Sequence, residues 1–212
     1  MTVLKPRQTV PALEVSTLQG PWSLGDQAPE NFTMLVFYRG LHCPICSKYL
    51  AELEKLGCLR TVITQNIDSL HQQAGNTDVI EFHGHARTLR CDDCGRRYKP
   101  KEVSYDDLPP RCTCGGPLRP DFVFFGEPIP VHAHMRAMDV ARQCDVLLVI
   151  GTSAVVAPAS HIPVVAKESG AFIIEINPVP SALTNSISDI YIPAPAGKAM
   201  PLIVDEVKTL KG

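Results

Sequence analysis

The sequence predicts an α/β protein with a doubly wound parallel (Rossmann-like) sheet and one small module inserted into it. Short apolar, β-branched runs alternate with segments of helical periodicity, as in sheets that helices cover on both faces. The segment 85–119 breaks this alternation because it is polar, rich in Arg and Pro, and carries four cysteines. It therefore reads as an insertion into the sheet domain.

Length and composition are ordinary for a globular protein. The chain has 212 residues, of which 45% are hydrophobic and 20% charged, enough for one large domain or a domain with a small module. A net charge of -2 provides no basic surface for nucleic acid, so we expect no nucleic-acid partner. The longest apolar stretch, Val146 to Ala159, is interrupted and too short to span a membrane, and no signal peptide is visible. We expect a cytoplasmic protein without membrane contact.

The first elements are a strand, a helix and two further strands. Thr33 to Tyr38 is a compact apolar run of strand type, and Lys48 to Leu56 repeats its leucines at helical spacing. Gly57 then suits a helix end. Strands are expected next at Thr61 to Thr64 and at Val79 to Phe82.

The second half continues the alternation. Its expected strands are 145–150, 171–176 and 190–192, and its expected helices are 132–142, 162–169 and 200–210. The first two strands are largely apolar and rich in β-branched residues, which is typical of strands buried on both faces of a parallel sheet.

Four cysteines within the inserted segment have metal-ligand spacing. Cys91 and Cys94 form a C-x2-C pair, and Cys112 and Cys114 form a C-x-C pair after seventeen intervening residues. Two tight pairs at this distance can present four thiolates to Zn²⁺ in a tetrahedron. Because four protein ligands leave no open position, the metal is expected to be structural. The alternatives are free thiols or a disulfide.

Polar residues follow several of the expected strands. Thr64-Gln65-Asn66-Ile67-Asp68 lies between a strand and a helix, Gly151-Thr152-Ser153 follows strand 145–150 and is expected to open a helix, and Asn177 follows strand 171–176. Ligands of doubly wound sheets bind at the carboxyl ends of the strands, so these groups are expected to face a nucleotide. His83 follows another strand and is a candidate general base, although a single His beside Gly is more often a turn residue.

In this order, the motifs resemble those of the sirtuins, the NAD-dependent protein lysine deacylases. The resemblance covers residues from about 58 to 212. The motifs that carry it are Thr64-Gln65-Asn66-Ile67-Asp68, Phe82-His83-Gly84, the four cysteines, Leu118-Arg119-Pro120-Asp121 with Phe125-Gly126-Glu127, Gly151-Thr152-Ser153 with Pro158-Ala159, and Glu175-Ile176-Asn177.

The resemblance implies that NAD and an acyl-lysine protein or peptide bind in one cleft, with zinc in the inserted module. Nicotinamide is released and the acyl group passes to ADP-ribose, with His83 as the catalytic base. The implied cofactor-binding residues are Asn66 and Asp68 in the nicotinamide pocket, Gln65 at the ribose, Gly151, Thr152, Ser153 and Asn177 at the adenosine half, and Ala199 at the adenine. The implied substrate-binding residues form a strand that pairs with the peptide: Phe124, Phe125, Gly126 and Glu127.

The N-terminal part departs from the sirtuin pattern. The Gly-Ala-Gly phosphate loop with which that pattern begins does not occur in this sequence, so we expect impaired turnover. Residues 1–50 instead resemble the start of a peroxiredoxin or related thioredoxin-fold protein, in Phe37-Tyr38-Arg39-Gly40 and Cys43-Pro44-Ile45-Cys46. The predicted domains are a βα segment at 1–57, a sirtuin-type NAD-binding domain at 58–84 and 120–212, and a zinc module at 85–119.

Two other functions remain open at this point. One is thiol redox chemistry at Cys43 and Cys46, because a cysteine at a helix start can be reactive; the alternative for both is an ordinary thiol. The other is a non-catalytic, zinc-stabilised module that binds peptide or nucleotide.

Overall fold

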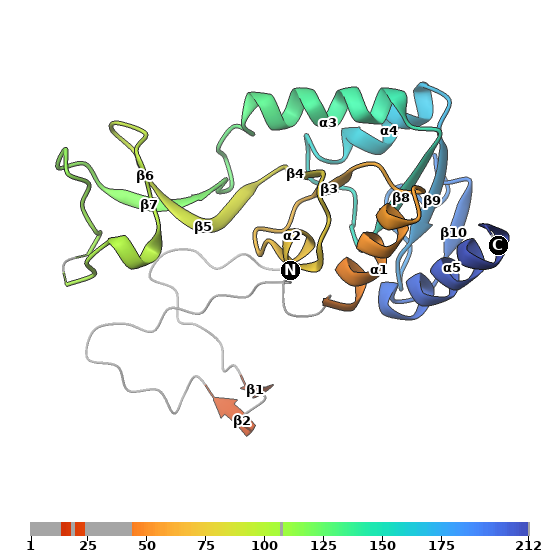
Figure 1. The fold of residues 1–212 in the computed structure, drawn as a ribbon, viewed down its shortest axis with the longest axis horizontal. Coiled ribbons are helices and arrows are strands. Elements are labelled where there is room, and N and C mark those ends of the chain that lie inside the picture. Colours follow the sequence, from red (N-terminus) through yellow and green to blue (C-terminus); the bar gives the residue numbers. More distant parts are fainter. Residues whose placement is uncertain (1–13, 18–19, 24–43, 107, 212) are drawn as a thin grey trace. The chain divides into compact units, whose positions relative to one another are not determined.

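The computed structural model describes residues 14–17, 20–23, 44–106 and 108–211 (Figure 1). The chain divides into two compact units, Met1–Tyr38 and Arg39–Gly212. In the first unit, β1 (Glu14–Thr17) and β2 (Gly20–Ser23) pair antiparallel, with Val15 opposite Trp22. The strand predicted at 33–38 lies outside the described residues.

The described part of the second unit contains two sets of parallel strands. One set is the pair β3–β4, and the other has the order β10-β9-β8. These strands are β3 (Val62–Thr64), β4 (Val79–Glu81), β8 (Val146–Ile150), β9 (Phe172–Ile176) and β10 (Ile190–Ile192). The five predicted strands and their parallel direction are therefore confirmed, with ends that differ by one residue at most.

Helices occupy the connections between these strands. They are α1 (Pro44–Lys55), α2 (Leu70–Ala74), α3 (Val131–Gln143), α4 (His161–Glu168) and α5 (Ala196–Lys211). The helix α1 begins four residues before the predicted start, at a proline whose fixed φ suits a first turn. The helix α2 lies where a helix is expected after the polar segment 64–68, but its bounds are not predicted, because five residues are too few for a periodicity. None of the helices in the described ranges combines the length and apolar character needed to cross a bilayer.

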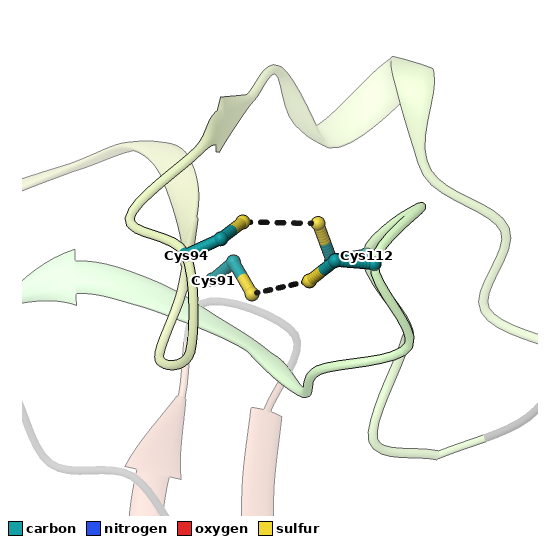
Figure 2. A group of neighbouring side chains, drawn as sticks. Cys91, Cys94 and Cys112 are labelled. Carbon is teal, nitrogen blue, oxygen red and sulfur yellow. Dashed lines mark hydrogen bonds between the residues drawn. The ribbon is translucent and has the colours of Figure 1, made fainter.

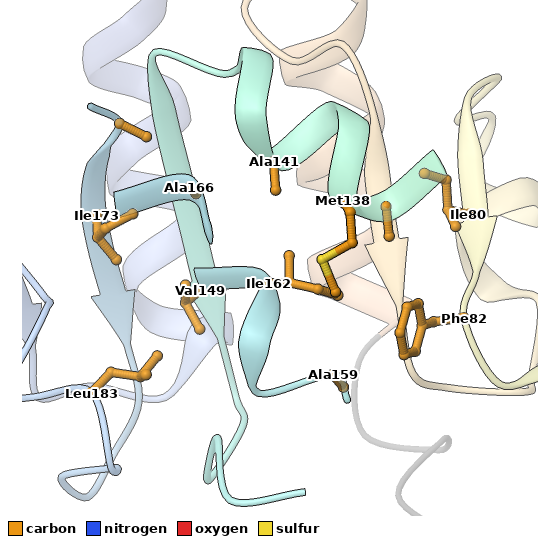
Figure 3. Close-up of a cluster of buried hydrophobic side chains, with 12 residues drawn as sticks. Ile80, Phe82, Met138, Ala141, Val149, Ala159, Ile162, Ala166, Ile173 and Leu183 are labelled. Atoms are coloured by element: carbon orange, nitrogen blue, oxygen red, sulfur yellow. The ribbon is translucent and has the colours of Figure 1, made fainter. Parts of the chain in front are cut away.

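The strands β8, β9 and β10 have an apolar core on each face. Val149 and Ile173 pack with α3 and α4, together with Ile80 and Phe82 from the β4 segment (Figure 3). Their chain neighbours Leu148 and Ile174 point to the other face, where they pack with α1 and α5. This alternation confirms the doubly wound arrangement. It also shows that β4 shares a core with the three-stranded set.

The segment between β4 and α3 folds as an antiparallel sheet. Its central strand β5 (Gly84–Cys91) pairs with β6 (Arg97–Tyr98) and β7 (Leu118–Phe122), and a short 3-10 helix spans Pro100–Glu102. A small core of its own consists of buried Leu89, Cys91, Cys112 and Leu118. The predicted break in the α/β alternation at 85–119 is thus a small antiparallel module.

Two local predictions are wrong. Phe124 to Glu127 is not a strand but a turn, in which the Glu127 amide donates to the Phe124 carbonyl at 3.0 Å and Gly126 has φ +88°. Gly151-Thr152-Ser153 does not open a helix, because α4 begins only at His161. In the first case Gly126 follows the apolar residues, and in the second Pro158 follows the small residues. A glycine or proline at such a place changes the direction of the chain.

We expect Phe82→Ala to destabilise the protein by about 3–5 kcal/mol, since it empties a position that joins β4 to α3 and α4. Phe82 is 0% exposed, whereas Phe125 is 98% exposed. Phe125→Ala is therefore the matched control and should leave the free energy of unfolding within about 0.5 kcal/mol. Urea unfolding of both variants checks this; equal losses would contradict the assignment of Phe82 to the core.

Candidate functional site

The four predicted zinc ligands come together in the antiparallel module. Cys91, at the end of β5, and Cys94, in the turn before β6, face Cys112 on the loop before β7 (Figure 2). Cys114 lies on the same loop, with its sulfur next to that of Cys91. All four sulfurs lie within 4.8 Å of one another. The Cys91–Cys114 and Cys94–Cys112 sulfur distances are each 3.6 Å.

This geometry fits a zinc ion. Zn–S bonds of about 2.3 Å in a tetrahedron place the sulfurs about 3.8 Å apart. A disulfide requires about 2.05 Å, and all four thiols are free. A backbone hydrogen bond from Cys114 and one from the Tyr98 hydroxyl lower the pKa of Cys112 to about 6, whereas the neighbouring sulfurs raise the pKa of Cys114 to about 12. Four crowded sulfurs of this kind need a cation to remain thiolates together. Four sulfur ligands close the coordination sphere, so the site is structural.

The polar loop after β3 is held by its own side chains. The Asn66 amide donates to Thr64 Oγ1 at 3.1 Å, and the amide of Leu70, the first residue of α2, donates to Asp68 Oδ1 at 3.0 Å. The other carboxylate oxygen of Asp68, Oδ2, is buried and has no partner among the described residues. A buried carboxylate oxygen without a donor is costly, so Asp68 offers an acceptor to a ligand.

Ser69, directly after this loop, has a strained backbone. Its φ is +61° and it is 4% exposed, a left-handed conformation that non-glycine residues seldom adopt. The Ser69 hydroxyl donates to Glu81 Oε1 at 3.2 Å and accepts from the Arg87 guanidinium. These two contacts hold Ser69, and with it the end of the polar loop, against β4 and β5.

Glu81 and Arg87 form an ion pair behind the loop. Arg87 Nη2 donates to Glu81 Oε2 at 2.6 Å. Burial raises the pKa of Glu81, but the hydrogen bond and charge of Arg87 outweigh it, so the pKa lies below its ordinary value. The same hydrogen bond raises the pKa of Arg87. Both groups therefore stay charged at neutral pH.

His83 lies beside the same loop. Its Nδ1 is 3.1 Å from the carbonyl oxygen of Gln65. Because a carbonyl only accepts, Nδ1 carries the proton in neutral His83, and Nε2 is left with a free lone pair. The backbone is fixed as well, since the Val123 amide donates to the His83 carbonyl at 2.9 Å. In its neutral form, His83 is thus oriented to accept a proton at Nε2.

A second group of predicted residues meets at the carboxyl ends of β8 and β9. Asn177 Nδ2 donates to the Thr152 carbonyl at 2.9 Å, and the Gly151 amide donates to the Ile176 carbonyl at 3.0 Å. Gly151 and Ser153 are exposed. Ala199, in contrast, is 5% exposed and packs in the core between the sheet and α5; its role towards adenine stays a prediction.

The turn after β7 is fixed by an ion pair. Arg119 Nη2 donates to Glu127 Oε2 at 2.7 Å, and the same oxygen accepts from the Phe124 amide at 3.0 Å. The Arg119 hydrogen bond, with that of the Phe124 amide, lowers the pKa of Glu127 to about 2. Arg119 also lies 4.7 Å from the centre of the Phe124 ring. Phe125 is left fully exposed at the tip of the turn.

Sequence reasoning missed Ser69, Glu81 and Arg87. No motif marks them, because their importance follows from contacts between β4, β5 and the loop. Of the possible redox residues, Cys43 lies outside the described residues, and Cys46 belongs to α1 without a described side chain.

Comparison with known proteins identifies relatives of this chain. The model of the Sir2 family matches residues 26–158. The chain is 52% identical over 163 residues to NAD-dependent protein deacylase 2 of Pyrobaculum aerophilum, covering 75% of this chain and 64% of that protein. It is 44% identical over 167 residues to the NAD-dependent protein deacylase of Pyrococcus furiosus, covering 76% of this chain and 66% of the relative.

Solved structures agree in fold. A Sir2 homologue in complex with NAD superposes with a TM-score of 0.75 at 40% identity, covering 79% of this chain and 66% of that one. A complex of Sir2 with a p53 peptide and NAD+ has a TM-score of 0.73 at 31% identity, covering 78% and 70%. The matched part of the chain spans slightly less than two thirds of the length of the Pyrobaculum aerophilum and Pyrococcus furiosus proteins. These matches do not favour the thiol redox alternative.

We expect Cys112→Ser to release zinc, because one of four thiolate ligands is lost. A loss of about 2 kcal/mol or more would lower the Tm by roughly 4–8 °C in a chain of this size. Elemental analysis and calorimetry measure both effects. Cys58 is exposed and lies outside the cluster, so Cys58→Ser is the control. Full zinc content in Cys112→Ser would contradict the four-sulfur site.

Two substitutions of Ser69 separate the contribution of its hydroxyl to stability from that of its strained backbone. Ser69→Ala removes the contacts with Glu81 and Arg87 and should cost about 1–3 kcal/mol. Ser69→Gly loses the same hydroxyl but relieves the positive φ, so we expect it to be about 1–2 kcal/mol more stable than Ser69→Ala. Chemical unfolding of both variants measures the difference, and equal stabilities would mean that the left-handed backbone carries no strain.

Proposed function

Since the chain belongs to the Sir2 family, we propose that it is an NAD-dependent protein lysine deacylase. The observation that supports this most is that one polar loop carries Asp68, with its unpartnered acceptor, and also holds His83 through the Gln65 carbonyl, which leaves His83 Nε2 free. The names of its relatives point to the same activity. The zinc module contributes stability and no chemistry.

The residues present fit NAD as the cofactor. The orphan Oδ2 of Asp68 is an acceptor of the kind that a carboxamide NH₂ group needs, and Asn66 lies two residues before it. Gly151, Thr152, Ser153 and Asn177 would hold the adenosine half at the carboxyl ends of β8 and β9, where doubly wound sheets bind nucleotides. When bound, NAD supplies an electrophilic ribose carbon through loss of nicotinamide.

His83 would act as the general base. Its Nε2 lone pair accepts a proton from a hydroxyl in the site, while Nδ1 keeps its own proton on the Gln65 carbonyl. The imidazolium that forms is stabilised by that carbonyl dipole. His83 therefore does not need to reorient between proton uptake and release.

The substrate would be a protein or peptide that carries an acyl-lysine. The turn Phe124–Glu127 has exposed apolar side chains at Phe124 and Phe125, and the Arg119–Glu127 pair fixes its shape. An extended peptide could lie along this turn and the end of β7 by strand addition. The Phe124 amide, already bound to Glu127, is not available for that pairing.

Incubation of the full, zinc-loaded chain with NAD and an acetyl-lysine peptide tests the proposal by mass spectrometry. The expected products are free nicotinamide, deacetylated peptide and O-acetyl-ADP-ribose. We expect His83→Ala to lower the rate by about 10²–10⁴-fold, the usual contribution of a general base, without a change in Tm.

The matched control is His132→Ala, which removes an exposed imidazole from α3 and should leave the rate unchanged. A folded, zinc-loaded wild type that forms no product would refute the proposed function. A His83→Ala variant as fast as the wild type would refute only the assignment of the base.

A further inference from the structure

Tyr98 lies next to the sulfur cluster, although it is not one of the ligands. It is half-buried at the end of β6, where it pairs with Leu89 of β5 and packs on the small core of the module. Its hydroxyl oxygen is 3.1 Å from Cys112 Sγ. Among the described residues, this is the nearest oxygen that the hydrogen bonds assign to any of the four sulfurs; Thr113 Oγ1 is 4.0 Å from the same sulfur.

The direction of this hydrogen bond is fixed once Cys112 is a ligand. A metal-bound thiolate has no proton, so the Tyr98 hydroxyl must donate and the sulfur must accept. Cys112 is 5% exposed, whereas Cys94 and Cys114 are exposed. Water can therefore donate to the exposed sulfurs, while buried Cys112 depends on donors from the protein, namely the Cys114 amide and the Tyr98 hydroxyl.

The same hydroxyl also holds the second cysteine pair. Its oxygen accepts from the Thr113 amide at 3.3 Å and lies 3.3 Å from Thr113 Oγ1. Thr113 is the single residue between Cys112 and Cys114. One side chain from β6 thus contacts both a ligand and the residue that sets the spacing of the C-x-C pair.

We propose that Tyr98 is a positioning residue of the zinc site, which donates to the Cys112 thiolate and fixes the short C-x-C loop through Thr113. Four thiolates around Zn²⁺ leave a net charge of about −2 on the cluster, and a donated hydrogen bond offsets part of it. Outer partners of this kind orient the ligands, and their loss typically weakens metal binding about 10- to 100-fold.

The test uses Tyr98→Phe in the full chain, which keeps the ring in the core and removes the hydroxyl. We expect release of zinc to an excess of chelator to be about 10-fold faster or more. In the cobalt-substituted protein, the thiolate-to-cobalt charge-transfer band should move to longer wavelength, because a sulfur without the hydrogen bond gives up its electrons more easily. The control is Tyr105→Phe, at a half-exposed tyrosine of the same module.

Both effects in Tyr98→Phe, with Tyr105→Phe like the wild type, would support the proposal. Wild-type release and an unmoved band would overturn it. Faster release together with an unmoved band would also overturn it, since looser packing alone explains that result. If Tyr98→Phe does not fold, the replacement Tyr98→4-aminophenylalanine keeps the ring and a weaker donor. We then expect faster zinc release than in the wild type and a charge-transfer band shifted to longer wavelength by less than complete loss of the donor would cause. Wild-type values of both would overturn the proposal.

Discussion

The close crossing of Gly84 over Asp121 is the constraint on which the site depends. Gly84 has φ +73°, and a Cβ there would lie 2.5 Å from the Asp121 carbonyl oxygen. Only glycine allows both the conformation and this approach. The crossing is where β4 of the parallel part turns into β5 and meets β7. It brings His83 against the Gln65 carbonyl and against Val123 at the same time.

Around this crossing, polar contacts hold the loop in place of apolar packing. The Glu81–Arg87 pair lies behind the loop of Asn66 and Asp68, and the Ala86 amide donates to the Ile67 carbonyl at 3.0 Å. The short loop of Asn66 and Asp68 is therefore held by the β5 backbone and, through Ser69, by the Arg87 side chain. Such a network fixes a single arrangement as long as its members stay paired. Strain at Ser69 persists because these neighbours determine its position.

The apolar layers support the site from a distance. Phe82 is buried in the core under α3 and α4 and directly precedes His83 in the chain. The core therefore fixes the backbone next to the catalytic candidate. On the other face, α1 is tied to the rest of the fold by Leu50 and Leu53 against α5, and by Glu54, which accepts from Asn76 Nδ2 at 2.6 Å. The zinc module has only a small core of its own, which is why a metal is needed to stabilise it.

The sequence alone determined the features that depend on neighbours in the chain. Apolar periodicity located α1, α3, α4 and α5 and the parallel strands, and the cysteine spacing identified the four ligands, because each pattern repeats within a few residues. It could not locate the contacts made across long separations. The tertiary structure decided that Gln65 fixes the tautomer of His83, that Arg87 holds Ser69, that Tyr98 reaches Cys112, and that Phe124–Glu127 is a turn closed by Arg119. Each of these joins side chains and backbone from different elements, whose relative positions are set only when the cores pack.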